Sequence, residues 1–268
     1  FYMKKIEMYC VTNKVVEHLH KTNYNIGWVG KEKSPQSYVN CADEDNIFFK
    51  EKYYSELTFH YWYWKNRLNL ENVQWIGFCQ KRRFWIKKKS TGKKIDYLNF
   101  RDHILDDIPP EFLDYDSILC NPINVNNVKR SKLFKRGFRS IIKDPSIIFN
   151  TNKQNLLLHF DMHHGYGNME KAIKLINEED RVDFLDYLKN SISFSPNIMF
   201  IAKSSIVNKW FNVLFPWLLR CEKVFGFSKL SGYDTQRLYA YLAERYLSFW
   251  FKKHTNYLNW PWILVDFD

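Results

Sequence analysis

The stretch from Trp75 to Trp85 constrains the fold of this chain more than any other segment. It begins as an apolar run and then turns abruptly into three consecutive cations, Lys81, Arg82 and Arg83. In open α/β sheets, ligands bind outside the carboxyl ends of the strands. The pattern therefore predicts a buried strand over 73–79 that presents positive charge to an anion, most simply a phosphate. An ordinary solvated turn after the strand is the alternative interpretation.

The remaining hydrophobic pattern places this strand in an α/β fold. Alternation and strand-forming residues predict further strands at 5–11, 25–30, 117–120 and 197–202. Helical periodicity predicts helices at 53–67, 169–190, 204–225 and 234–252. Strand, helix and strand in this order favour a Rossmann-like, mostly parallel sheet flanked by helices. Because no linker rich in Pro or Gly divides the chain, we expect one domain over 3–268, with an α/β half at 3–122 and a helix-rich half at 123–268.

The charge of the chain limits its partners. The net charge is +11, which attracts nucleic acid, nucleotide phosphates or an anionic membrane surface. One run of cations contains no acid: Lys129, Arg130, Lys132, Lys135, Arg136, Arg139 and Lys143. This run predicts a platform for phospholipid headgroups or another anion, and a solvated or mobile loop is the alternative.

The cysteines and the apolar segments indicate the compartment. None of the five cysteines forms a CxxC pair, and Cys10, Cys79 and Cys120 each close an apolar run, which is typical of small buried residues. This usage favours a reducing compartment. No signal peptide or long apolar span is visible, and Met3 is expected to be the native start.

Common catalytic motifs are absent from the sequence. There is no P-loop, GxGxxG, HExxH or GxSxG motif, and no zinc-ligand spacing. Asp43 and Asp45 have the spacing of a metal clamp, but they do not end an apolar strand. Helix capping is the alternative for these carboxylates.

Two further pairs of polar residues are candidates for chemistry. His163 and His164 are expected in a polar loop that opens the helix at 169, where an imidazole could bind phosphate, carry a proton or ligate a metal. Arg237 and Glu244 lie seven residues apart in the last expected helix, hence on one face. Among apolar neighbours, Glu244 is expected to be either a structural ion-pair partner or a functional carboxylate.

Several ordered motifs together resemble a bacterial family of capsule and O-antigen glycosyltransferases, long labelled a domain of unknown function. The matching segments are Val11-Thr-Asn-Lys14, Asp45-Asn-Ile47, Tyr54-Ser-Glu-Leu-Thr-Phe-His-Tyr-Trp-Tyr-Trp-Lys-Asn66, Trp75–Trp85, Asn197-Ile-Met-Phe-Ile201 and Arg237-Leu-Tyr-Ala-Tyr-Leu-Ala-Glu-Arg245. The chain departs from the family where a His-Tyr-Arg-Arg motif becomes Gln80-Lys-Arg-Arg83 and where an opening histidine becomes Asn13.

The resemblance implies a GT-A-like fold and transfer of a hexose, with galactose favoured, from a nucleotide diphosphate such as a UDP-hexose to a cell-surface glycan or lipid-linked acceptor. The resemblance and the sequence pattern together predict these donor-binding residues: Thr12, Lys14, Glu56, Lys81, Arg82, Arg83, Asn197, Arg237 and Arg245. Glu244 is the first candidate for the catalytic base, with Asp45 and His164 as alternates.

We expect no required cofactor, because cations stand where many GT-A enzymes place a metal-binding Asp-x-Asp. Mn²⁺ or Mg²⁺ held by Asp43 and Asp45 is the fallback. The expected location is cytoplasmic, with peripheral contact to the inner face of the bacterial inner membrane through 129–143. No nucleic-acid partner is expected, although a basic nucleic-acid-binding protein and a non-catalytic scaffold of an envelope-polysaccharide complex are the competing classes.

Overall fold

The computed structural model describes residues 5–20, 22–71 and 74–267, so Met3 lies outside the described residues. The chain gathers into two compact units. Unit 1 comprises 1–121, 197–213 and 250–268, and unit 2 comprises 122–196 and 214–249. The expectation of a single domain over 3–268, with halves at 3–122 and 123–268, stays a prediction.

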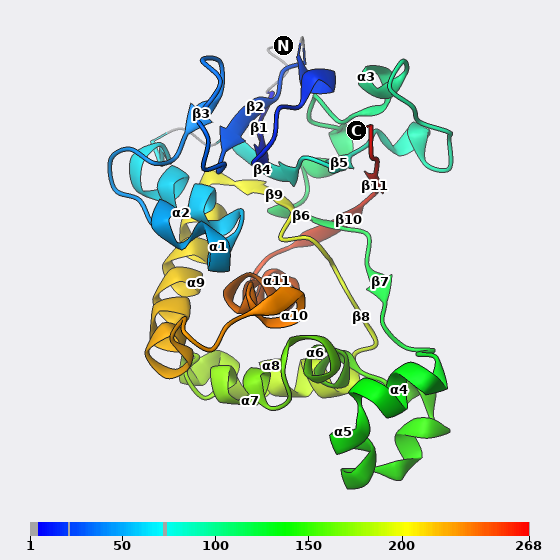
Figure 1. Ribbon diagram of the computed structural model, residues 1–268. Helices are drawn as coiled ribbons and strands as arrows, with labels where there is room; N and C mark the ends of the chain where they lie inside the picture. The colour runs from blue at the N-terminus through cyan, green and yellow to red at the C-terminus, as the bar shows by residue number, and fades with distance from the viewer. Residues whose placement is uncertain (1–4, 21, 72–73, 268) are drawn as a thin grey trace. The chain divides into compact units, whose positions relative to one another are not determined.

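Unit 1 is built around one sheet (Figure 1). Its strands are β1 (Ile6–Thr12), β2 (Asn25–Trp28), β3 (Val39–Asn40), β4 (Trp75–Gln80), β5 (Arg83–Trp85), β6 (Ser117–Cys120), β9 (Phe200–Lys203), β10 (Tyr257–Trp260) and β11 (Trp262–Leu264). Its short helices are α1 (Glu51–Tyr54), α2 (Leu57–Asn66) and α3 (Phe100–His103).

The sheet runs in the order β10-β6-β9-β4-β1-β2-β3, and β5 and β11 extend it from β4. Strands β4, β1, β2 and β3 are parallel, as are β10 and β6, whereas β9 is antiparallel to both of its neighbours. The predicted α/β fold with a mostly parallel sheet flanked by helices is confirmed. In the β1–β4 pair Val11 lies opposite Gln80, so the carboxyl ends of these two strands are adjacent.

The helix expected over 53–67 is wrong as one element, because it is broken into α1 and α2. Ser55 has a φ of 52°, a left-handed conformation that ends α1 and lets Glu56 start a new turn. The strand expected over 73–79 is β4, which begins at Trp75, and Val73 lies outside the described residues.

Helix α2 packs closely on the sheet through aromatic rings. Phe59 of α2 lies 5.3 Å from Tyr9 of β1, between ring centroids. A Cβ added at Gly27 of β2 would stand 2.5 Å from the Phe59 ring, so only glycine leaves room for this approach. His60 on the same helix is buried among Phe78, Phe200 and Phe211, and burial lowers its pKa to about 3.

Unit 2 is helical, with one short antiparallel strand pair. Its elements are β7 (Ile123–Asn124), α4 (Arg130–Arg136), α5 (Phe138–Lys143), α6 (Leu156–His164), α7 (Asn168–Ile173), α8 (Glu178–Asn190), β8 (Ser193–Phe194) and α10 (Gly232–Thr235). Two long helices, α9 (Ser204–Phe225) and α11 (Leu238–His254), belong partly to each unit along the chain.

Three sequence-based boundaries are wrong in the second half. The helix expected over 169–190 divides into α7 and α8 around Lys174–Asn177, and the helix expected over 234–252 divides into α10 and α11. The strand expected over 197–202 begins at Phe200, because Asn197 and Ile198 adopt positive φ values of 77° and 53°. Hydrophobic periodicity continues through such breaks and does not reveal them.

Aromatic side chains from three helices form the core of unit 2. Tyr246 of α11 packs 4.9 Å from Trp217 of α9 and 5.1 Å from Phe184 of α8, between ring centroids. The Tyr246 hydroxyl donates to Asp180 at 2.8 Å, which satisfies this buried carboxylate.

Two further features concern the cysteines and the apolar character of the helices. All five cysteines are buried and free, which confirms the expectation for Cys10, Cys79 and Cys120. Over the described residues, none of the helices combines the length and apolar character needed to cross a membrane.

Candidate functional site

The carboxyl ends of β1 and β4 bring the first group of predicted residues together. The Thr12 hydroxyl donates to the carbonyl of Lys14 at 2.7 Å and accepts from the amide of Lys14 at 3.0 Å, which fixes the turn after β1. From the turn after β4, the Lys81 ammonium donates to Asn13 Oδ1 at 2.7 Å. The parallel pairing of β1 with β4 therefore places Thr12, Lys14 and Lys81 at one edge of the sheet, as expected from sequence.

The three consecutive cations do not act as one group. Lys81 and Arg82 occupy the two-residue turn of a hairpin, and Arg83 returns into the sheet opposite Gln80. The guanidinium of Arg82 is paired with Asp266 at 2.9 Å, and both side chains are about half exposed. Lys81 and Arg83 contact the side-chain amides of Asn13 and Gln80, and these contacts orient the two cations.

Gln80 is the centre of a polar network within unit 1. Its Oε1 accepts from Arg83 at 3.0 Å, and its Nε2 donates to the carbonyl of Asn197 at 2.5 Å and to the carboxylate of Glu56. Glu56 reaches this position because the break at Ser55 starts α2 there. Ile198, which follows Asn197, has a left-handed φ that is unusual for a β-branched residue, and such strain clusters at functional sites.

A small hollow lies beside this cluster. It is lined by residues that include Lys14, Lys81 and Arg82 and has a volume of about 10 Å³. Because this volume holds about one water, a nucleotide cannot occupy it. A donor at this edge would lie across the open surface of the strand ends.

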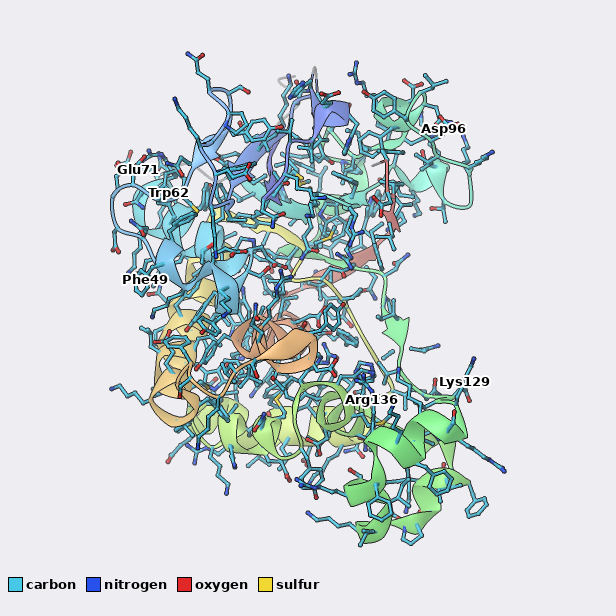
Figure 2. All side chains as sticks on the ribbon, in the orientation of Figure 1. Phe49, Trp62, Glu71, Asp96, Lys129 and Arg136 are labelled. Carbon is cyan, nitrogen blue, oxygen red and sulfur yellow. The ribbon has the colours of Figure 1, made fainter. Side chains whose placement is uncertain are left out.

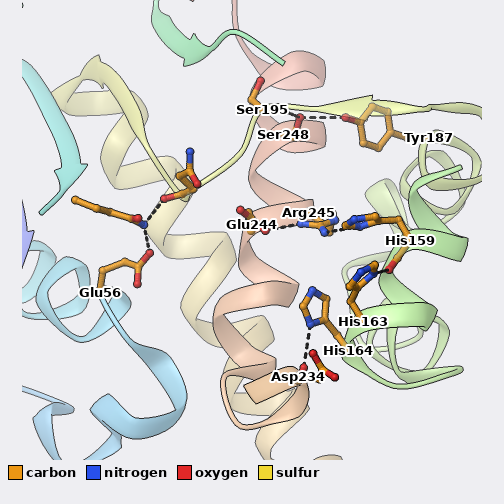
Figure 3. Close-up of polar contacts among 12 residues, drawn as sticks. Glu56, His159, His163, His164, Tyr187, Ser195, Asp234, Glu244, Arg245 and Ser248 are labelled. Atoms are coloured by element: carbon orange, nitrogen blue, oxygen red, sulfur yellow. Dashed lines mark hydrogen bonds and ion pairs between the residues drawn. The ribbon is translucent and has the colours of Figure 1, made fainter. Parts of the chain in front are cut away.

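Unit 2 contains a different polar cluster, centred on Arg245 of α11 (Figure 3). The side chain of Arg245 is only 1% exposed and is paired with the carboxylate of its neighbour Glu244, which is 17% exposed. Its other terminal nitrogen donates to His159 Nδ1 at 3.0 Å, and its guanidinium carbon lies 3.8 Å from the centre of the Phe194 ring. Burial and the adjacent Arg245 lower the pKa of His159 to about 2, so this imidazole is neutral and accepts the hydrogen bond.

His163 and His164 end helix α6 and do not lie in a loop, so the predicted local structure is wrong. His163 Nδ1 bonds to the carbonyl of His159 at 2.8 Å. His164 is buried and stacks on Tyr241 at 3.7 Å between ring centroids. Its Nδ1 bonds to the carbonyl of Asp234 at 3.0 Å (Figure 3). Burial lowers the pKa of His164 to about 3, which keeps it neutral.

Arg237 is not part of the helix that carries Glu244, contrary to the sequence-based expectation. Helix α11 begins at Leu238, and Arg237 precedes it as an exposed residue. The carbonyl of Arg237 accepts a hydrogen bond from the amide of Tyr241 at 3.1 Å, so Arg237 caps the start of α11. Glu244 forms an ion pair with Arg245.

Asp43 and Asp45, the fallback metal ligands, accept hydrogen bonds from neutral side chains. Asp45 Oδ1 accepts from the Tyr61 hydroxyl at 3.2 Å, and Asp43 Oδ2 accepts from the Asn40 amide at 3.2 Å. Within the described ranges, no group of three or more His, Cys, Asp or Glu residues is arranged to hold a metal ion. Asp43 and Asp45 would thus need ligands from the donor itself.

A hollow of about 640 Å³ lies in unit 2. Tyr166 and the buried apolar side chain of Leu158 form part of its lining, together with the carboxylate of Asp161. Burial raises the pKa of Asp161 to about 6, although its Oδ1 accepts a hydrogen bond from the amide of Gly167 at 3.0 Å. An aromatic ring beside carboxylate and amide groups suits a polar ligand with apolar faces.

Four residues of these clusters were not predicted from the sequence as site residues: Asn13, Gln80, His159 and Asp161. The signal for the first two was present, because both are departures from the family pattern, and both now contact a cation. No local pattern marks His159 as a partner of Arg245, since 86 residues separate them.

The comparisons with known proteins give the fold relationship. A structure titled "WbbM bifunctional glycosytransferase apo structure" matches with a TM-score of 0.72 and 17% identity. The match covers 98% of this chain and 46% of that one, so this chain spans about half of the neighbour's length. No curated protein matches this chain. The family model described as "Domain of unknown function (DUF4422)" matches residues 7–255, and the chain therefore belongs to this family.

Proposed function

We propose that this protein is a glycosyltransferase that moves a hexose from a nucleoside diphosphate donor to a glycan or lipid-linked acceptor. The observation that carries the proposal is the hydrogen bond from Lys81 to Asn13, with Arg83 held by Gln80, at the joined carboxyl ends of β1 and β4. Ligands of open α/β sheets bind at such ends. The glycosyltransferase fold of the structural neighbour adds support.

In this proposal the two amide-held cations bind the donor diphosphate. As the sugar–phosphate bond breaks, negative charge grows on the diphosphate, and preoriented cations stabilise it. The neutral side chains of Asn13 and Gln80 orient Lys81 and Arg83. Arg82 contributes less because Asp266 pairs with it. Thr12 and Lys14 would contact the base or ribose, and Glu56 and Asn197 would fix Gln80.

A divalent metal is not required in this proposal, since cations occupy the end of β4. A chelator should leave most of the transfer activity, and added Mn²⁺ should raise it by less than about threefold. Complete loss on chelation with full recovery in Mn²⁺ would contradict the proposal and would make Asp43 and Asp45 ligands.

Glu244 is proposed as the residue that accepts the proton of the acceptor hydroxyl, with Arg245 as its positioning residue. Their contact and the partial exposure of Glu244 support a carboxylate held in one orientation yet reachable. The Glu244→Gln variant should bind donor normally and lose transfer by a factor of at least 100. Transfer at the parent rate in a folded variant would show that Glu244 only balances the buried charge of Arg245. Asp45 and His164 would then be tested, although the stacked, buried His164 is the weaker alternate.

The hollow beside Tyr166 and Asp161 is proposed to receive part of the acceptor. Aromatic rings and hydrogen-bonding side chains serve the apolar and polar faces of a sugar ring. The protein would work on the cytoplasmic side of the inner membrane, on glycans of the capsule or O-antigen type.

The deciding experiment is a panel of radiolabelled nucleotide sugars, scored by donor binding and by hydrolysis. A UDP-hexose, with UDP-galactose first, should bind and be hydrolysed slowly without acceptor. Binding of a labelled oligonucleotide with no nucleotide-sugar binding would favour the nucleic-acid class instead. Donor binding without hydrolysis or transfer to any acceptor would favour the scaffold class.

A further inference from the structure

Helices α4 and α5 and the turn after them expose bulky apolar side chains to solvent. The exposed fractions are 50% for Phe134, 58% for Phe138, 64% for Ile142 and 79% for Phe149. Phe138 and Ile142 lie four residues apart in α5, which is the spacing of one helical face, and Phe134 belongs to α4, which ends at Arg136. We call these four residues the apolar ridge.

The apolar ridge is not left over from a failure to pack. The inward side of α4 and α5 is filled by Leu133 and Ile141, which join Leu158 and Met162 of α6 in a small buried core. The local fold is therefore complete without the ridge. Exposing four large apolar side chains on two successive short helices and the turn after them costs solubility, and exposed apolar surface of this kind marks interaction sites.

The same segment carries the run of seven cations, all of them exposed. Figure 2 labels two of them, Lys129 and Arg136, at the ends of the segment that forms α4. Arg136 is paired with Asp234 at 3.1 Å. By contrast, no ion pair among the described residues involves the other cations of α4 and its start: Lys129, Arg130, Lys132 and Lys135.

We propose that the apolar ridge and these cations form a docking surface for an anionic lipid bilayer. Surface-lying helices with this composition bury aromatic and aliphatic side chains at the headgroup boundary, while Lys and Arg contact anionic headgroups. Charge complementarity selects this occupant, because each Lys or Arg near an anionic surface adds attraction. A second copy of the chain would bring seven like charges against seven. Ile142 offers no ring for a nucleobase to stack on.

This inference goes beyond the proposed function, since it concerns where the protein lies and not which donor it uses. The docking surface belongs to unit 2, whereas the proposed diphosphate site belongs to unit 1. Failure of one would not imply failure of the other, because vesicle binding and donor binding are separate measurements.

The test is cosedimentation of the full chain with vesicles of phosphatidylcholine, either alone or mixed with about 30% of the anionic lipid phosphatidylglycerol. We expect binding to the anionic vesicles to be at least tenfold stronger. The double variant Phe138→Ser and Phe149→Ser should weaken it at least tenfold. The matched control is Phe49→Ser, since Phe49 is 78% exposed but lies in unit 1 (Figure 2). That control should bind as the parent does.

Charge is tested by the triple variant Lys129→Gln, Lys132→Gln and Lys135→Gln against a control triple at exposed lysines of unit 1, Lys89, Lys93 and Lys94. Each removed charge should weaken binding by roughly fivefold at low salt. Equal losses in both triples would show a nonspecific effect of net charge and would overturn the docking surface.

A fluorescence measurement covers the case in which the serine variants do not fold. In a Phe149→Trp variant, addition of anionic vesicles should produce a difference spectrum with emission shifted to the blue, while Phe49→Trp should produce none. No shift at position 149 while the parent binds vesicles would refute the proposal. The proposal would also be refuted if heparin or RNA competed fully with the vesicles and its binding did not require the apolar ridge.

Discussion

In unit 1, Lys81 and Arg83 are held by the oxygens of the neutral residues Asn13 and Gln80, whereas in unit 2 Arg245 is held by the carboxylate of Glu244. The first cations lie at the surface-facing end of a sheet and the last is almost fully buried. A buried guanidinium needs a counter-charge to offset its lost hydration. A cation that is held by an amide meets no opposite charge in that contact. The partner chemistry thus separates a candidate binding cation from a structural one.

The largest expected effect tests the structural side of this comparison. Glu244→Ala should lower the free energy of unfolding by about 3–5 kcal/mol, because it leaves the charge of Arg245 buried without compensation. Arg245→Met should cost less, since Glu244 can reach water. Urea unfolding followed by circular dichroism measures both. A smaller loss for Glu244→Ala than for Arg245→Met would break the comparison.

The next effect tests the binding side. Lys81→Gln and Arg83→Gln should each weaken nucleoside diphosphate binding roughly 10- to 150-fold, as expected from about 1.5–3 kcal/mol for a charge-assisted hydrogen bond. Stability should change little. Calorimetric titration with UDP measures the affinity. Arg82→Gln is the neighbouring control, and an equal loss there would show that the triplet acts as undifferentiated charge.

Histidine burial predicts how unit 2 responds to acid. Burial lowers the folded-state pKa of His159 to about 2 and of His164 to about 3, while the unfolded chain binds these protons near pH 6.5. The stability that the folded state gains from these two neutral histidines is therefore complete above pH 6.5 and is lost as the pH falls below it. At pH 5.5 each of the two histidines lowers the free energy of unfolding by about 1.4 kcal/mol.

The measurement is the free energy of unfolding at pH 7.5 and 5.5 for the parent and for His164→Asn. The variant should lose about 1.4 kcal/mol less on acidification. Asp161 provides a control of opposite sign, because its pKa is raised to about 6 and acidification favours its folded, protonated form. Asp161→Asn should make the acid loss steeper. An unchanged pH dependence in both variants would contradict this account.

The smallest effect concerns the ion pair of Arg82 with Asp266. Both partners are about half exposed, and surface pairs of this kind contribute about 0–1 kcal/mol. Asp266→Asn should therefore leave the unfolding free energy within about 0.5 kcal/mol of the parent. By freeing Arg82, it should tighten diphosphate binding slightly, up to about threefold. Weaker binding would show that Asp266 positions Arg82 for the ligand.

Parts of the candidate site could be predicted from the sequence, and other parts could not. The adjacency of Thr12, Lys14 and Lys81 was predictable, because parallel pairing of two apolar strands brings their carboxyl ends together. The contact of Glu56 with Gln80 was not, since it depends on the break at Ser55 within a continuous aromatic periodicity. The exclusion of Arg237 from α11 depends likewise on a boundary that hydrophobic spacing does not mark.

The sequence by itself determined the α/β order, the buried cysteines and the gathering of cations at two places, because these follow from local pattern and charge. Tertiary structure alone decided which cation meets which partner: Asp266 for Arg82, Asn13 for Lys81 and His159 for Arg245. These partners lie 184, 68 and 86 residues away along the chain. Hydrogen bonds and ion pairs act over a few ångströms in space, so only the folded chain, through strand pairing and helix packing, brings such groups together.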